Sequence, residues 1–140
     1  MVDKARLTKY LDAIETYLRQ LKELRQYPLN DFLSDWKIYD LVDRKLHLTL
    51  ESFLTIGEML IGEFSFRKPD TYADIPRILH ENKVIGGTLK DSLVDLARFR
   101  NVLVHDYLYL NHEIVYTRLQ KIPAIIEEFI EAVKSFVVDR

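Results

Sequence analysis

One short segment of the chain combines the side chains that bind and cleave a phosphodiester. The segment RFRNVLVHDY carries Arg98, Arg100, Asn101, His105 and Tyr107, separated by large apolar residues that predict packing into a core. An arginine guanidinium presents a planar set of donors that suits phosphate oxygens. A histidine gives or takes a proton near neutral pH. Together these groups could move or break a phosphodiester without a metal.

The spacing of these residues sets which of them share a helix face. Asn101 and His105 are four residues apart and lie on one face, and Arg98, seven before His105, points the same way. Arg100 is five before His105 and points about 140° away. Two arrangements would bring Arg100 and His105 to one phosphate. Either the helix unwinds near His105, or two copies of the chain meet across a two-fold axis.

Each candidate residue has a chemical role and a structural alternative. His105 would act as base on a ribose 2′-hydroxyl or as acid on the 5′ leaving oxygen, or else is a helix-end histidine favoured by the helix dipole. Arg100 would clamp the scissile phosphate, or else forms a helix ion pair. Asn101 would orient His105 or bind phosphate, or else caps backbone groups or bridges a dimer.

The two outer residues are similarly open. Tyr107 is a modification acceptor or substrate contact if its phenol is exposed, and otherwise amphipathic packing. Arg98 is an RNA contact or a surface charge.

Composition bounds the class of protein. The chain has 140 residues, 48% of them hydrophobic and 30% charged, which predicts one globular domain over residues 1–140. The absence of cysteine excludes disulfides, thiolate metal sites and a cysteine nucleophile. A net charge of -2 excludes coating of nucleic acid by bulk positive charge. Any contact with nucleic acid therefore needs a local basic cleft.

Apolar residues recur with helical period through the whole chain, and prolines and glycines are few. We expect an all-α bundle of five to six helices, two of them long. Trp36 and Leu41 belong to the apolar row of the second helix, and Gly57 is placed where another helix comes close. Pro123 should break or kink the last helical region. The expected helices span about residues 3–26, 31 or 35 to 61, 72–82, 89–104, and 113 onward, with a final stretch over 124–138.

Two further features concern the location of the protein and its need for a metal. Apolar stretches fall short of the ~20 residues that span a bilayer, so a cytoplasmic protein without membrane contact is expected. His47 has Asp43 four before it and Glu51 four after it. Such a set resembles metal ligands but is more often a group of surface ion pairs. We therefore expect no metal and no cofactor.

The motif resembles that of a known family. Arg100-Asn101-x3-His105-x-Tyr107 is similar to the Arg-x4-His-x-Tyr motif of HEPN-domain proteins, and in particular of the HepT-like toxin branch. The similarity covers nearly the whole chain, since residues 72–75, 85–87 and 109–116 follow that family's order.

This resemblance implies a dimeric helical bundle with the motif at the subunit interface. It further implies a metal-independent endoribonuclease toxin that cleaves RNA by 2′-hydroxyl attack. Its partner would be a small nucleotidyltransferase antitoxin that attaches adenylyl groups to the motif tyrosine, here Tyr107. A non-catalytic HEPN dimer that binds a nucleotide or the nucleotidyltransferase is the alternative, and a plain interaction bundle is a third.

Overall fold

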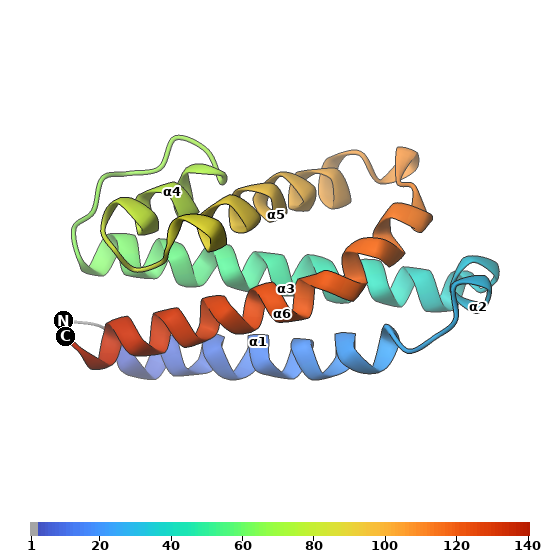
Figure 1. Ribbon diagram of the computed structural model, residues 1–140, viewed down its shortest axis with the longest axis horizontal. Coiled ribbons are helices and arrows are strands. Elements are labelled where there is room, and N and C mark those ends of the chain that lie inside the picture. The colour runs from blue at the N-terminus through green and yellow to red at the C-terminus, as the bar shows by residue number, and fades with distance from the viewer. Residues whose placement is uncertain (1–2) are drawn as a thin grey trace.

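The computed structural model describes residues 3–140, and within them it contains helices and no strand (Figure 1). The all-α bundle expected from the sequence is confirmed. The elements in chain order are α1 (Lys4–Leu24), α2 (Leu29–Ser34), α3 (Trp36–Glu63), α4 (Asp74–Glu81), α5 (Gly87–His105), the 3-10 helix η1 (Tyr107–Tyr109) and α6 (His112–Val138).

The helix α3 lies at the centre of the bundle. It packs against α1 and α6 on one side and against α4 and α5 on the other (Figure 1). This central place explains its broad apolar surface, which includes the fully buried Leu46, Leu50 and Phe53. Phe53 meets Phe129 of α6 edge to face, with ring centroids 5.2 Å apart. The bundle thereby fixes α5, which carries the motif, against the middle of α3.

The long central helix begins at the later of the two expected positions. The chain breaks between α2 and α3, because Asp35 is extended and its carboxylate accepts the Lys37 N–H at 3.0 Å. Two other expectations need correction. Trp36 and Leu41 are 60% and 46% exposed, so helical period did not place them in the core. Of the break or kink expected at Pro123, the break is wrong: α6 runs through Pro123, which is buried in the packed face of the helix, and that packing outweighs one lost hydrogen bond.

No helix within residues 3–140 has both the length and the apolar character needed to cross a membrane.

Gly57 lies where α4 crosses α3, as its position in the apolar row predicted. A Cβ atom built on Gly57 would overlap the Cγ2 atom of Ile75, whereas one built on Gly62 would meet nothing within 4 Å. Glycine is therefore required at residue 57 for the close approach of α4, and at residue 62 it is not.

We expect Gly57→Ala to lower the free energy of unfolding by about 1–3 kcal/mol, because the added methyl group forces α4 away from α3. Gly62→Ala is the matched control on the same helix, and it should be neutral or stabilising by up to about 1 kcal/mol. Urea unfolding followed by circular dichroism measures both. Equal stability of the two variants would contradict the account.

Candidate functional site

A cleft opens between the C-terminal end of α5, the helix α3 and the loop over residues 64–73. Its volume is about 580 Å³. It is lined by Glu58, Pro69, Asp70, Thr71, Tyr72, Ile75, Asn101, His105 and Asp106.

Asn101 and His105 both line this cleft, on the shared helix face that their spacing predicts. The helix is continuous to His105, and the Asp106 N–H still bonds to the Val102 carbonyl at 3.0 Å. The arrangement in which the helix unwinds near His105 is therefore wrong, because the last turn keeps its backbone hydrogen bond.

Arg100 points away from the cleft and into the bundle, as its position on the helix predicts. It is only 9% exposed, and its Nε donates to Oε1 of Glu51 on α3 at 2.6 Å. Its Nη2 contacts the same carboxylate. The ring of Tyr72 covers the guanidinium, with 4.6 Å from Cζ to the ring centroid. A nearly buried cation is thus neutralised by one carboxylate and shielded by one aromatic ring.

Arg100 is joined to the cleft through its neighbour. Its Nη1 donates to Oδ1 of Asn101 at 3.1 Å, which leaves the Asn101 amide N–H groups as donors for the cleft. At the other end, Nε2 of His47 lies 3.3 Å from Oε1 of Glu51. We call this connected set, His47, Glu51, Arg100 and Asn101, the Arg100 network.

The other two candidates lie outside the lining residues of the cleft. Arg98 is exposed on α5. Tyr107 begins η1 and is 64% exposed, so its phenol is accessible. Leu108 and Tyr109, which follow, are 79% and 87% exposed. The structure thus brings Asn101 and His105 together, links Arg100 to them, and places Arg98 and Tyr107 on the surface nearby in sequence.

Sequence reasoning did not assign Glu51 or Tyr72 to the site. Glu51 was grouped with Asp43 and His47 as surface ion pairs. Instead Glu51 pairs with His47 and Arg100, while Asp43 pairs with Nε2 of His112 on α6 at 2.8 Å. The sequence signal that could have identified Glu51 is a carboxylate placed among the largely buried residues of the central helix. Within residues 3–140, no three His, Asp or Glu side chains gather as metal ligands.

The Asp43–His112 pair fixes the start of α6, just after η1. Burial raises the pKa of Asp43 above its usual value, and the bond to His112 opposes this effect. The ring of His112 also packs on Tyr39, with centroids 4.2 Å apart. The pair therefore anchors one end of the exposed Tyr107–Tyr109 segment to α3.

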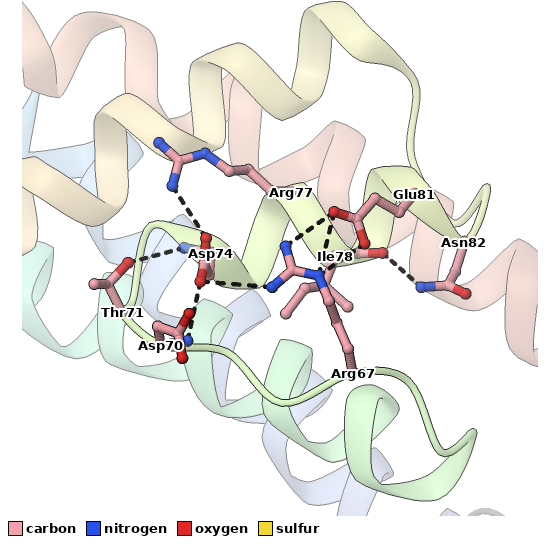
Figure 2. Close-up of polar contacts among 8 residues, drawn as sticks. All are labelled: Arg67, Asp70, Thr71, Asp74, Arg77, Ile78, Glu81 and Asn82. Carbon is pink, nitrogen blue, oxygen red and sulfur yellow. Dashed lines mark hydrogen bonds and ion pairs between the residues drawn. The ribbon is translucent and has the colours of Figure 1, made fainter.

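Ion pairs hold the loop that forms the cleft wall (Figure 2). Arg67 binds Glu81 through Nε and Nη2, at 3.0 Å and 2.9 Å, and also lies 3.7 Å from Asp74. Asp74 accepts the backbone N–H of Asp70 at 3.0 Å and pairs with Arg77 at 3.2 Å. These contacts, the Asp70 N–H first, lower the pKa of Asp74. They hold the loop residues 70–72 in place against α4.

A bundle of this shape, with this motif at the end of α5, has the HEPN fold. The family model for the HepT-like ribonucleases (Ribonuclease HepT-like) matches residues 14–133, and the chain belongs to that family.

Individual relatives are distant but cover the chain almost completely. YutE, a cytosolic protein of unknown function from Bacillus subtilis, is 28% identical over 139 residues, which are 97% of this chain and 90% of YutE. Its structure aligns with a TM-score of 0.81 over 97% of this chain and 91% of YutE. The mRNA nuclease HepT of Shewanella oneidensis is 28% identical over 127 residues, 89% of this chain and 96% of HepT.

A solved complex shares the fold. The tri-AMPylated HEPN toxin of Shewanella oneidensis, bound to its MNT antitoxin, aligns with a TM-score of 0.86 at 24% identity. The alignment covers 96% of this chain and 99% of the toxin.

We expect Glu51→Ala to lower the free energy of unfolding by roughly 1–3 kcal/mol, because it leaves the guanidinium of Arg100 nearly buried without its acceptor. Glu51→Gln keeps an acceptor oxygen and should lose less. The control is Glu58→Ala, at an exposed position of the same helix, which should change stability by less than about 0.5 kcal/mol. Thermal and urea unfolding compare the three. Equal stability of Glu51→Ala and Glu58→Ala would show that the Arg100 network does not contribute to the stability of the fold.

Proposed function

We propose that this protein is the metal-independent endoribonuclease toxin of a toxin–antitoxin pair. The observation that carries the proposal is that His105 and Asn101 line one cleft, and that Arg100 is hydrogen-bonded to Asn101. Membership of the HepT-like ribonuclease family supports it. Residues 1–140 would act as a single domain, in the cytoplasm, where RNA is available.

The reaction needs a base, an acid and stabilisation of phosphate charge. His105 takes the proton of a ribose 2′-hydroxyl as that oxygen attacks the adjacent phosphorus. The bond to the 5′ oxygen breaks, an acid returns a proton to that oxygen, and a 2′,3′-cyclic phosphate remains. The amide N–H groups of Asn101 bind a phosphate oxygen, and Arg100 orients that amide and adds positive charge nearby.

A second copy of the chain would complete the site. One His105 cannot serve as base and acid in the same step, and Arg100 of one chain is already paired with Glu51. Three carboxylates, Glu58, Asp70 and Asp106, also line the cleft and repel phosphate. A two-fold dimer that joins the ends of two α5 helices would supply a second His105 and the exposed Arg98.

The partner that controls the toxin would be a small nucleotidyltransferase antitoxin. The similar toxin of Shewanella oneidensis is bound to an MNT antitoxin and is AMPylated. In this chain the exposed phenol of Tyr107 is the acceptor we propose. An adenylyl group on Tyr107 would bring a negative phosphate and a bulky base beside the cleft, which blocks RNA.

One observation favours the alternative of a non-catalytic HEPN dimer that binds a nucleotide or the nucleotidyltransferase. Arg100 is nearly buried, and its guanidinium is bound by Glu51 and Asn101. In such a protein Arg100 would serve only to join α5 to α3.

We expect the purified protein to cleave single-stranded RNA in the presence of EDTA, because the proposed chemistry uses only protein side chains. His105→Ala should reduce the rate about 10²- to 10⁴-fold. Arg100→Gln, which keeps donors for Glu51, should also reduce the rate while the circular dichroism spectrum is unchanged. His80→Ala, an exposed histidine on α4, is the control and should cleave normally. Full activity of His105→Ala would overturn the assignment, and loss of activity in EDTA would indicate a metal.

We expect Tyr107→Phe to escape neutralisation by the partner nucleotidyltransferase, because it lacks the acceptor oxygen. Mass spectrometry of protein co-expressed with that partner should show additions of one or more adenylyl groups on wild type and on the control Tyr109→Phe. Tyr107→Phe should show none. Adenylyl groups on another residue, or inhibition of unmodified protein, would contradict modification of Tyr107.

A further inference from the structure

The cleft beside His105 is lined by one aromatic side chain, Tyr72, and binding a phosphate group gives this ring no role. We propose that Tyr72 is a nucleobase-stacking residue, and that the part of the cleft next to Tyr72 binds the base of the nucleotide being cleaved. This proposal rests on the proposed function, since it names where the RNA substrate places its base.

The ring of Tyr72 has one covered face and an accessible remainder. Arg100 covers one face at 4.6 Å, and Arg100 is itself fixed by Glu51 at 2.6 Å. Tyr72 nevertheless keeps 40% of its surface exposed, and it lines the cleft. The arrangement leaves a rigidly backed aromatic surface on the cleft wall, which is what base stacking requires.

Charge indicates a base rather than a phosphate at this place. Glu58 and Asp70 line the same cleft as Tyr72 and carry negative charge at neutral pH. They repel a phosphate group, but their oxygens accept hydrogen bonds from the amino and imino groups of a base. The hydroxyl of Thr71, also in the lining, can donate or accept. The acidic lining thus fits the uncharged half of a nucleotide.

The loop that carries Tyr72 is held in position before any ligand binds. Asp74 accepts the Asp70 N–H, and Arg67 joins this loop to Glu81 at the end of α4 (Figure 2). Asp74 also binds the hydroxyl of Thr71 through its backbone N–H, at 3.3 Å. Because this loop is already ordered, stacking on Tyr72 loses little conformational entropy. His105 and Asn101 lie in the same cleft, so a base stacked there belongs to the nucleotide next to the scissile phosphate.

The test measures binding and cleavage separately. Binding uses proteins that carry His105→Ala, so that RNA stays intact, and a single-stranded RNA with 2-aminopurine, whose fluorescence falls when it stacks on an aromatic ring. Tyr72→Leu should weaken binding roughly 5- to 100-fold and abolish the quenching. Tyr72→Phe, which restores a ring, should restore both. Tyr27→Leu is the matched control, because Tyr27 lies between α1 and α2, is 42% exposed and does not line the cleft.

Cleavage kinetics with His105 present exclude an indirect role through Arg100. A stacking residue changes KM, so Tyr72→Leu should raise KM by a similar factor with kcat nearly constant. A fall in kcat at constant KM would overturn the proposal, because Tyr72 would then only position Arg100. Quenching that persists in Tyr72→Leu would also overturn it. RNA that binds and stacks on Tyr72 without being cleaved would support the base subsite and refute only the proposed nuclease.

Discussion

The near-burial of one cation governs the arrangement of this site. A guanidinium removed from water is tolerated only when a carboxylate and further acceptors satisfy it. Arg100 obtains both from Glu51 of α3 and Asn101 of α5. The bond to Glu51 joins α5 to the central helix and turns Arg100 away from the cleft. The bond to Asn101 fixes the amide of that residue at the edge of the cleft. The position of His105, one helical turn later on the same face, follows from that anchor.

Much of this arrangement could be predicted from local sequence. The steps of four and five residues within the motif correctly separated Asn101 and His105 from Arg100. Local sequence could not supply Glu51, because it lies 49 residues before Arg100 and only the packing of α3 against α5 brings them together. It could not supply Tyr72 either, since that residue lies in a loop shaped by Arg67 and Asp74.

Where the sequence reading was wrong, tertiary packing was the reason. The helical period placed Trp36 in the apolar row of the helix, but Trp36 is the first residue of α3 and its side chain is exposed. Pro123 suggested a break because it removes one backbone donor, and the buried face of α6 compensates for that loss. The position of Gly57 was predictable, because a glycine inside an apolar row indicates the close approach of another helix.

The central claim is that a second copy of the chain completes the site, so that each cleavage event uses His105 of both subunits. The most direct measurement unfolds equal amounts of wild type and His105→Ala and refolds them together, so that half of the dimers are mixed and carry one His105. If both histidines are needed, only the dimers that are wholly wild type cleave RNA, and the mixture should show roughly a quarter of the activity of the same total amount of wild type. Roughly half of that activity, with mixed dimers verified by mass spectrometry, would contradict the claim and show that each chain carries a complete site.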